Sequence, residues 1–463
     1  MSTPKLDERD PESRIARLVD AGKYEFLIPR TDCGMIAVTG DINGNKVVIF
    51  ASDATIKSGA LGVDGSKVIV TAYKAAMGAQ VPIVGIWHSG GARLSDGVAS
   101  LDAFGEVFQS MISASGRIPQ LSLVLGPTAG GGAYGPALTD VVVLAPEGRI
   151  FVTGPDVVKS VTGEDIDMAL LGGPEAHRKN SGLAHIIAAT EQEAFDDIRD
   201  LTSLFANQGF MDPHVKDSDL STLVPDSKVR TYDVHPLISA LLDTDTECVE
   251  LLSMWAPNMT TILGRLGGAT IGVLANNPAH IAGVLDAAAG EKAARFVRTC
   301  DAFGIPLLVI ADVQGFLPGA GQEWEGAVRR GAKLLHAFGE AVVPRVTLIT
   351  RRAYGGAYVA MNSKALGATK VLAWPQAEVS VMGAVAAVRV LHRRILADLP
   401  AEQRESMELE LAAEHEKISG GVARAVEIGA VDEIIEPLRT RSAIAAIIAD
   451  APHRRGAHGN IPL

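Results

Sequence analysis

The segment Arg351–Met361, RRAYGGAYVAM, contains the residues of this chain that are best suited to chemistry. It follows a short apolar run, Val346–Thr350, that predicts a buried strand, and it leads into a segment that can be helical, Val359–Leu366. Glycines at such a junction let the chain turn sharply and leave backbone N–H groups free at a helix start. These groups favour negative charge, and over a carbonyl they form an oxyanion hole. Tight packing of a strand against a helix gives the same pattern, so one turn alone is a weak signal.

The chain contains this glycine turn twice. An earlier run, Gly130, Gly131 and Gly132 followed by Ala133 and Tyr134, matches Gly355, Gly356, Ala357 and Tyr358, and the two tyrosines are 358 − 134 = 224 residues apart. The repeat extends upstream, because residues 118–125 match residues 343–349 and residues 81–86 match residues 305–310. This duplication favours a functional role for the turns over a role in packing alone.

Each half also has a second glycine turn, Ser89–Gly91 in the first and Gly315–Gly319 in the second. A repeat this long predicts two related domains rather than a solenoid. Apolar runs with few alternating polar residues predict buried, mostly parallel strands, and therefore an α/β fold. The polar segment Gly209–Arg230 is the best linker candidate, which gives domains of residues 1–228 and 229–463. Two free-amide turns in each half predict a site between the domains.

The composition argues against several classes of function. The net charge of −12 argues against non-specific binding of nucleic acid. The three cysteines, Cys33, Cys248 and Cys300, form no CxxC pair, so no zinc ribbon or redox pair is indicated and no metal is expected. Met1–Leu18 lacks the apolar core of a signal peptide, and no uncharged apolar run reaches transmembrane length. A cytoplasmic, reducing setting is therefore expected.

Several ordered motifs resemble one family, the carboxyltransferase (β) subunits of biotin-dependent acyl-CoA carboxylases. They are Trp87–Leu94, Gly126–Gly131, Phe151–Val158, Glu291–Phe296, Arg351–Tyr358 and Ala373–Ala384. The resemblance spans nearly the whole chain, and it is strongest to the actinobacterial acetyl-/propionyl-CoA carboxylase type. It implies two tandem crotonase-fold (ClpP/crotonase-like) domains and an active site at a dimer interface.

The chemistry that this resemblance implies needs two oxyanion holes. Carboxybiotin gives up CO2, the α-carbon of the acyl-CoA is deprotonated, and the enolate captures the CO2. Negative charge then develops on the thioester oxygen and on the biotin ureido oxygen. By resemblance, Gly130 and Gly131, or alternatively Gly131 and Gly132, would stabilise the CoA enolate, and Gly356 and Ala357 the biotin enolate. Released biotin can take the α-proton itself, so no side-chain base is required.

Other residues are implied in substrate binding. The first-half turn supplies Ser89, Gly90, Gly91, Ala92 and Arg93, and the second half supplies Lys292, Gly315 and Val359. Arg93 and Lys292 are candidates for binding the CoA phosphates or for ordering the site; solvated surface charges are the alternative. Val359 is at a position that faces the acyl pocket in this family, and an apolar residue there suits a short unbranched or methyl-branched acyl group.

The resemblance also implies partners. No lysine between methionines, the biotinylation motif, occurs in the chain, so biotin would be carried on a separate biotin carboxylase and carrier (α) subunit. An acyl-CoA is the expected substrate, giving malonyl-CoA or methylmalonyl-CoA as product. The expected assembly is a homo-hexamer, a trimer of dimers. No nucleic acid, no membrane and no metal is expected.

Three departures from the family pattern lie in the second half. Gln314 replaces a proline that would fix the turn before Gly315, Val385 replaces a lysine, and Ala287–Gly290 replaces a serine-rich segment. They leave an alternative open, a biotin-independent decarboxylase of the same fold in a biosynthetic pathway. A further alternative is a non-catalytic partner subunit of a carboxylase, which would require damaged amide turns.

Overall fold

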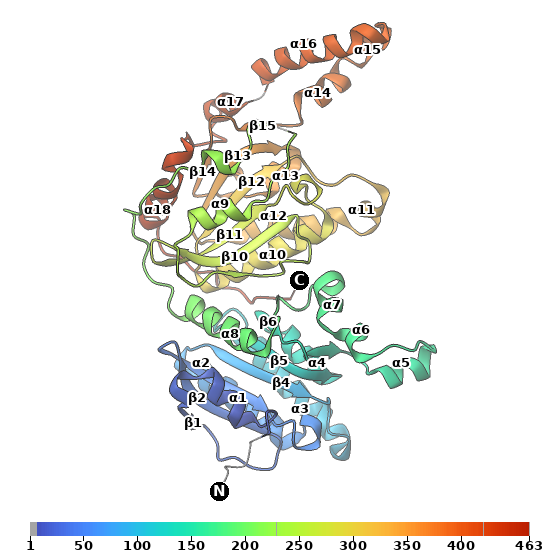
Figure 1. Cartoon of the computed structure of the whole chain (residues 1–463), viewed down its shortest axis with the longest axis vertical. Coiled ribbons are helices and arrows are strands. Elements are labelled where there is room, and N and C mark those ends of the chain that lie inside the picture. Colours follow the sequence, from blue (N-terminus) through green and yellow to red (C-terminus); the bar gives the residue numbers. More distant parts are fainter. Residues whose placement is uncertain (1–6, 228, 420, 463) are drawn as a thin grey trace. The chain divides into compact units, whose positions relative to one another are not determined.

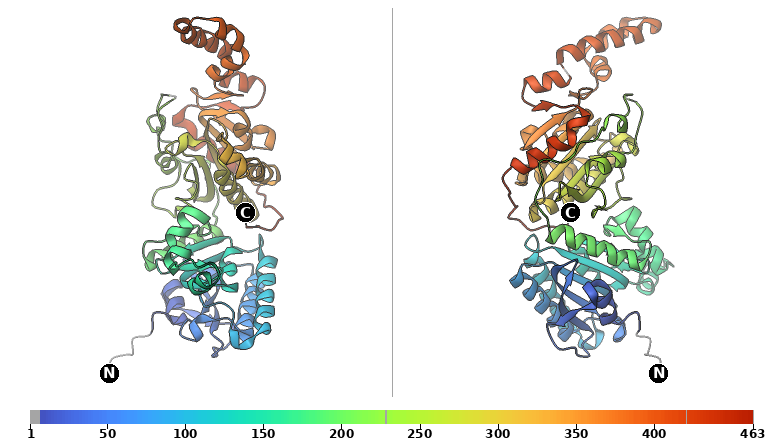
Figure 2. Two further views of the ribbon diagram at one scale, coloured as in Figure 1. Left: turned by 90° about the vertical axis from the view of Figure 1, so that its right-hand side faces the viewer. Right: turned by 60° about the vertical axis from the view of Figure 1, so that its left-hand side comes forward.

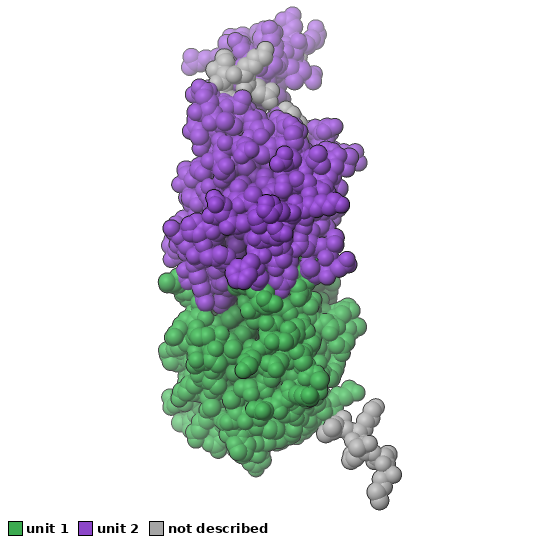
Figure 3. All heavy atoms as spheres, turned by 90° about the vertical axis from the view of Figure 1, so that its left-hand side faces the viewer, with its two compact units in different colours: residues 1–208, 247–255, 457–462 green, residues 209–246, 256–456, 463 purple. Residues whose placement is uncertain are grey.

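The computed structural model describes residues 7–227, 229–419 and 421–462. They form two compact units (Figure 1, Figure 3). Unit 1 contains residues up to 208 together with residues 247–255 and 457–462, and unit 2 contains residues 209–246 and 256–456. Two parts of the sequence predictions lie outside the described residues. One is Lys228, at the predicted domain border, and the other is residues 1–6, in the segment expected to lack a signal peptide. The assignment of residues 1–228 and 229–463 as functional domains stays a prediction.

Unit 1 is built on a mixed sheet with strand order β1-β2-β3-β4-β5-β6-β8, and β7 pairs with β5. Its strands are β1 (Tyr24–Phe26), β2 (Met35–Ile42), β3 (Asn45–Ser52), β4 (Ile83–Ser89), β5 (Gln120–Ala129), β6 (Val141–Leu144), β7 (Arg149–Phe151) and β8 (Ile186–Ile187). β1, β2 and β3 are antiparallel, whereas the pairs from β3 to β8 are parallel. Asn43 and Gly44, both with positive φ, form the hairpin turn between β2 and β3.

Unit 2 repeats this arrangement with the order β16-β14-β13-β12-β11-β10, and β15 pairs with β13. Its strands are β10 (Met259–Leu266), β11 (Ala269–Asn276), β12 (Leu307–Val313), β13 (Arg345–Tyr354), β14 (Lys370–Ala373), β15 (Glu378–Ser380) and β16 (Glu433–Ile434). Again an antiparallel hairpin opens the sheet and parallel pairs follow. The predicted repeat and the predicted buried parallel strands are therefore confirmed.

The helices of unit 1 are α1 (Pro11–Leu18), α2 (Val63–Ala79), α3 (Val98–Ala114), α4 (Gly131–Ala137), α5 (Pro155–Thr162), α6 (Met168–Gly172), α7 (Pro174–Ala176) and α8 (Glu191–Ala206). Of these, α1, α2, α4, α6 and α8 contact strands of the sheet, and α3 packs against α2. Figure 2 shows the same helices and strands from two further sides. In α1, Arg14, Ile15 and Leu18 are buried, whereas Ala16 and Arg17 are exposed. The spacing of the three buried residues, one, three and four positions, places them on a single face, which contacts α8 and β3.

The helices of unit 2 are more numerous than those of unit 1 among the described residues. They are α9 (His235–Leu241), α10 (Ala287–Phe303), α11 (Ala320–Trp324), α12 (Ala327–Glu340), α13 (Gly355–Ala360), α14 (Ala384–Leu391), α15 (Arg393–Asp398), α16 (Ala401–Ser419), α17 (Val422–Glu427) and α18 (Thr440–Asp450). α14, α15 and α16 share a small apolar core around Val388, Leu396 and Ala412. Among the described residues, no helix is both long and apolar enough to cross a bilayer.

Residues 457–462 fold with unit 1, although they follow the whole of unit 2 in the sequence. Asn460 is buried, and its Nδ2 donates to Oδ1 of Asp140 at 2.6 Å while its backbone N–H donates to Oγ of Ser115 at 2.8 Å. The other oxygen of Asp140 accepts the backbone N–H of Gln120, the first residue of β5. The segment therefore connects the helix α3, the strand β5 and the buried carboxylate of Asp140.

Candidate active site

The two glycine turns begin where the central parallel strands end. β5 leads through Gly130 into α4, and β13 leads directly into α13. Gly130 and Gly355 have φ values of 57° and 59°, a region that favours glycine. A Cβ on Gly355 would also lie 3.0 Å from the carbonyl oxygen of Val381. Glycine is therefore required at this position of both turns by backbone geometry.

The strand pairing gives a different match between the two turns than the sequence does. Ala129 pairs with Phe151 and Tyr354 pairs with Ser380, so the ends of β5 and β13 match at an offset of 354 − 129 = 225. Gly130 therefore corresponds to Gly355. The equivalent pairs that follow are Gly131 with Gly356, Gly132 with Ala357, and Tyr134 with Val359.

The prediction that Tyr134 matches Tyr358 is wrong by one residue. The exposed fractions agree with the structural match, because Tyr134 is 51% exposed and Val359 is 39% exposed. Tyr358 is half-buried instead, and its hydroxyl donates to the carbonyl of Ala430 at 3.1 Å. The two halves have similar residues at this point, but the structural alignment of the strands differs from the sequence alignment by one residue.

The residues after each turn start a helix, and the first N–H groups of a helix have no partner within it. In unit 1, α4 starts at Gly131, and in unit 2, α13 starts at Gly355, so Gly131 and Gly132, and likewise Gly356 and Ala357, lie in the first turn of a helix. Both turns therefore present adjacent backbone N–H groups, as an oxyanion hole requires.

The turn Ser89–Gly91 lies beside the first amide turn. A Cβ on Gly132 would lie 3.2 Å from Oγ of Ser89, and one on Gly91 would lie 3.0 Å from the carbonyl of Ala129. Ala92 forms a bridge to Leu61, and the N–H of Gly90 donates to the carbonyl of Ser58. The structure thus brings Ser89, Gly90, Gly91 and Ala92 together with the Gly130–Gly132 turn.

Arg93 and Lys292 both direct their charges toward backbone carbonyls. Nη2 of Arg93 donates to the carbonyls of Cys33 and Ala60, at 2.7 and 3.3 Å. Lys292 is 1% exposed, and its Nζ donates to the carbonyl of Ala256 at 3.3 Å. Through these hydrogen bonds each side chain is attached to the backbone of a neighbouring loop. A role of either residue in binding CoA phosphates stays a prediction.

In unit 2, Gly315 has a φ of 146°, and its carbonyl accepts the N–H of Leu285 just before α10. The next residue, Phe316, forms a bridge to Leu285, and the exposed Gln314 precedes the turn. This arrangement matches the contact between Ala92 and Leu61 in unit 1. The turn therefore keeps its place without the proline expected at position 314.

The other two departures have structural reasons. Val385 is partly buried and packs against the small apolar core of α14, α15 and α16, to which its side chain adds apolar contact. In the segment Ala287–Gly290, a Cβ on Gly290 would lie 3.3 Å from the Cα of Gly331, so small residues let α10 approach α12 closely. The side chain of Asp286 caps this helix by accepting the N–H of Ala289 at 2.7 Å.

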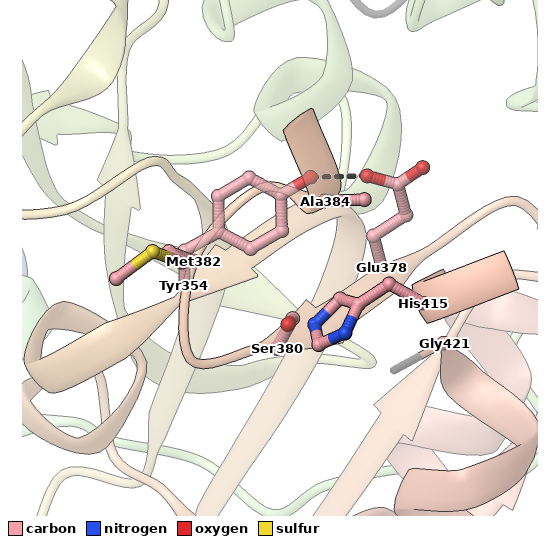
Figure 4. A pocket seen from close by; sticks show the side chains of 7 residues that line it. All are labelled: Tyr354, Glu378, Ser380, Met382, Ala384, His415 and Gly421. Atoms are coloured by element: carbon pink, nitrogen blue, oxygen red, sulfur yellow. Dashed lines mark hydrogen bonds between the residues drawn. The ribbon is translucent and has the colours of Figure 1, made fainter. Parts of the chain in front are cut away.

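A narrow cavity of about 20 Å³ lies beside the second turn (Figure 4). It is lined by Tyr354, Glu378, Ser380, Met382, Ala384, His415 and Gly421. The hydroxyl of Tyr354 is hydrogen-bonded to the carboxylate of Glu378, which connects the end of β13 to β15 (Figure 4). A volume of this size has room for about one water molecule, so the cavity is too small for an acyl-CoA or biotin.

His88 is the next-to-last residue of β4, and its imidazole is neutral near pH 7. Burial, together with the nearby charges of Arg14 and Arg9, lowers its pKa from the ordinary 6.5 to about 4. The unfolded chain therefore binds a proton between pH 6.5 and pH 4 that the folded protein does not, so acidification in this range destabilises the fold.

We expect His88→Asn to reduce this acid sensitivity, because asparagine does not titrate. The melting temperature of the variant should fall less between pH 7 and pH 4.5 than that of the wild type. Thermal unfolding followed by circular dichroism across this range provides the comparison. Parallel curves for the two proteins would show that His88 does not contribute to the acid response.

The chain matches known proteins over almost its full length. Residues 12–456 match the family described as the carboxyl transferase domain. The chain is 58% identical over 461 residues to the biotin-dependent acetyl-/propionyl-coenzyme A carboxylase beta6 subunit of Mycobacterium tuberculosis, covering 99% of this chain and 98% of that protein. It is 52% identical over 468 residues to the propionyl-CoA carboxylase beta chain of Rhodococcus erythropolis, covering 100% and 98%.

Among solved structures, the transcarboxylase 12S crystal structure matches with a TM-score of 0.91 and 34% identity, covering 98% of this chain and 92% of that one. That structure is described as a hexamer assembly with methylmalonyl-coenzyme A and methylmalonic acid bound.

The fold and the match to the family model define a carboxyltransferase with the two-domain crotonase-like fold. The chain belongs to the carboxyl transferase family, as its motifs predicted. The predictions of an α/β crotonase-type fold and of an enzyme of the transferase class are confirmed. The comparisons give no support to a biotin-independent decarboxylase.

Proposed function

We propose that this protein is the carboxyltransferase (β) subunit of a biotin-dependent acyl-CoA carboxylase. It transfers the carboxyl group from carboxybiotin to acetyl-CoA or propionyl-CoA and yields malonyl-CoA or methylmalonyl-CoA. The observation that carries the proposal is the 58% identity to an acetyl-/propionyl-CoA carboxylase subunit over 99% of the chain. The second support is that both glycine turns keep a backbone suited to binding an anion.

The structural match between the turns supports a choice that the sequence left open. Gly356 and Ala357 correspond to Gly131 and Gly132, rather than to Gly130 and Gly131. We therefore assign the N–H groups of Gly131 and Gly132 to the enolate oxygen of the acyl-CoA. Gly130 has the same positive φ as Gly355 and serves to turn the chain.

The N–H groups of Gly356 and Ala357 are then the donors for the ureido oxygen of biotin. Two adjacent N–H groups at a helix start fit an oxygen that gains negative charge, because they are fixed donors that need no reorganisation. Carboxybiotin, when bound, supplies the carboxyl group for transfer. The chain itself orients the two oxygens and stabilises their charge.

The acyl group would lie near Val359, which follows the second turn and is partly exposed. An apolar side chain favours a short hydrocarbon over a charged acyl group, because an apolar wall cannot solvate a carboxylate. This is consistent with acetyl and propionyl groups, which differ by one methylene, a difference worth about 1 kcal/mol in such a pocket.

The proposal includes a partner and an assembly. Biotin would be carried on a separate α subunit with biotin carboxylase activity, and the chain would form a homo-hexamer, a trimer of dimers. The relatives are named as β subunits or chains, and the similar transcarboxylase 12S is described as a hexamer. A cytoplasmic setting fits this role.

A carboxylation assay tests the function. The purified chain is mixed with a biotinylated α subunit, ATP, bicarbonate and either acetyl-CoA or propionyl-CoA. Carboxylated CoA product should form only when biotin is present on the α subunit. In a parallel reaction without biotin, malonyl-CoA should stay intact. Loss of CO2 from malonyl-CoA without biotin, and no carboxylation, would overturn the proposal in favour of a decarboxylase.

A further inference from the structure

The strand pairing is interrupted at the same place in both units. In unit 1 the partners Trp87 and Val124 are followed by Ser89 and Thr128, so two residues of β4 match four residues of β5. In unit 2 the partners Ala311 and Ile349 are followed by Val313 and Ala353, the same two-to-four step. Such bulges bend a strand and re-aim the residues after it. Both bulges lie directly before an amide turn.

One residue stands opposite each bulge, His88 in unit 1 and Asp312 in unit 2, and 312 − 88 = 224. Their backbones are held in the same way. The N–H of His88 donates to Oγ of Ser52 at 2.7 Å, and the N–H of Asp312 donates to Oδ1 of Asn276 at 3.3 Å. Ser52 and Asn276 are also 224 residues apart, so the two positions are structural equivalents.

The carbonyl groups of the same two residues confirm this equivalence. A Cβ on Gly59 would lie 1.9 Å from the carbonyl oxygen of His88, and a Cβ on Gly283 would lie 2.9 Å from that of Asp312. Each residue is therefore enclosed by a glycine on one side and by a polar side chain on the other.

In unit 2 the side chain of Asp312 binds the bulge directly. One of its oxygens lies 2.9 Å from Nε and from Nη2 of Arg351, and the other accepts from Nε of Arg352 at 2.9 Å. Asp312 is fully buried and Arg351 is nearly so. These two arginines are bulge residues, and they stand only a few positions before Gly355. The carboxylate thus holds two consecutive side chains that would otherwise point to opposite faces of the strand.

Arg351 is held further by groups outside the sheet. Its Nη1 donates to the carbonyls of Ser227 and Arg230, both at 2.8 Å, and its guanidinium lies 5.0 Å from the ring centre of Tyr232. A planar guanidinium with this many fixed contacts has little freedom. The bulge before the second turn is therefore rigid.

In unit 1 the position that corresponds to the carboxylate of Asp312 is occupied by the imidazole of His88. The imidazole of His88 lies over Gly126 of the bulge, where an added Cβ would come within 2.4 Å of its Nδ1. Nη2 of Arg14, from α1, lies 3.4 Å from Nδ1 of His88. Arginine can only donate, so Nδ1 accepts and the ring proton is on Nε2. Among the described residues, Nε and Nη1 of the buried Arg14 have no hydrogen-bond partner.

We propose that His88 and Asp312 are equivalent positioning residues that fix the direction in which each strand enters its amide turn. Asp312 sets the turn with Gly356 and Ala357, and His88 sets the turn with Gly131 and Gly132. The assignment of the turns to biotin and to acyl-CoA rests on the proposed function. The positioning itself does not.

The first test measures the turns directly by amide hydrogen exchange of the full-length protein. Asp312→Asn should speed exchange at residues 353–358 by about 10–100-fold, because hydrogen bonds to a charged group are lost, and leave residues 129–134 unchanged. His88→Leu should do the opposite, whereas His88→Asn, which keeps an acceptor near the position of Nδ1, should restore protection. Equal effects on both turns, or none, would overturn the proposal.

Asp312→Asn leaves two buried arginines without a carboxylate and can prevent folding. Arg352→Gln is the second variant, because it keeps the Asp312–Arg351 pair and removes only one partner. It should raise exchange at residues 353–358 by a smaller factor. Unchanged exchange in this variant would count against the proposal.

Two matched controls remove buried polar contacts on the same strands but before the bulges. Ser122→Ala on β5 removes the acceptor of Nε1 of Trp87, at 2.9 Å, and Arg345→Gln on β13 removes the donor to the carbonyl of Gly367, at 2.7 Å. Both should lower the melting temperature without changing exchange at the turns. Faster exchange at the turns in these controls, as large as in the test variants, would show that general destabilisation explains the effect.

The second test separates the two substrates kinetically. Decarboxylation of malonyl-CoA is measured with free biotin as the acceptor, and the Kd of propionyl-CoA is measured by calorimetry. Arg352→Gln should lower kcat/KM for biotin about tenfold and leave the Kd of propionyl-CoA within about twofold, whereas His88→Leu should weaken propionyl-CoA binding. A wild type without biotin-dependent turnover would contradict the proposed function, and the exchange data would still decide the positioning role.

Discussion

Proline in place of Gly356 is expected to lower turnover by about 10²–10³-fold, the usual effect of removing one oxyanion donor. Proline lacks the N–H group but suits the first turn of a helix, where that N–H has no partner within the helix. Space is available, because a Cβ on Gly356 would have only Cε2 of Phe316 nearby, at 3.9 Å. The fold should therefore survive while the donor is lost. Steady-state carboxylation with the α subunit measures the effect.

The control for this variant is Gly356→Ala, which adds a similar Cβ but keeps the N–H group. It should retain turnover within about tenfold of the wild type, because only the side-chain volume changes. Equal losses for alanine and proline would mean that the volume at position 356, and not the backbone N–H, limits the reaction.

Aspartate in place of Asn460 is expected to destabilise unit 1 by about 3 kcal/mol or more. The change replaces a donor with a second carboxylate against Oδ1 of Asp140, a buried group now 2.6 Å from Nδ2 of Asn460. For a unit of this size the melting temperature should fall by about 2–4 °C per kcal/mol. Differential scanning calorimetry at pH 7.5 measures the shift.

Two comparisons identify the cause of that shift. The destabilisation should become smaller toward pH 4, since protonation of one carboxylate restores a donor between the two groups. Ile461→Ala, a change at the exposed neighbouring residue, should have almost no effect. A melting temperature of Asn460→Asp equal to that of the wild type would mean that the segment 457–462 does not stabilise unit 1.

Much of the fold could be predicted because local patterns determine it. Apolar runs of strand length predicted β4, β5, β12 and β13, because buried parallel strands are apolar along their whole length. The glycine turns were found from their duplication, which is visible in the sequence alone. The family was recognised from motifs that keep their order along the chain.

What could not be predicted depends on contacts between distant residues. The structure matches Tyr134 with Val359 instead of Tyr358. This one-residue difference follows from strand pairing, which cannot be read from the sequence alone. The roles of Arg14 and His88 were missed because they come from α1 and β4, 74 residues apart, and meet only in the folded unit. Their signal in the sequence was weak, an arginine on the apolar side of a short helix.

The return of residues 457–462 to unit 1 has a consequence for biosynthesis. A nascent chain can assemble most of unit 1 while unit 2 is still being translated, but Asp140 meets Asn460 only after all of unit 2 has left the ribosome. During translation, unit 1 is thus exposed for a long time in an incomplete form. The last step in folding unit 1 is therefore post-translational, because the partner of Asp140 is three residues from the last residue of the sequence.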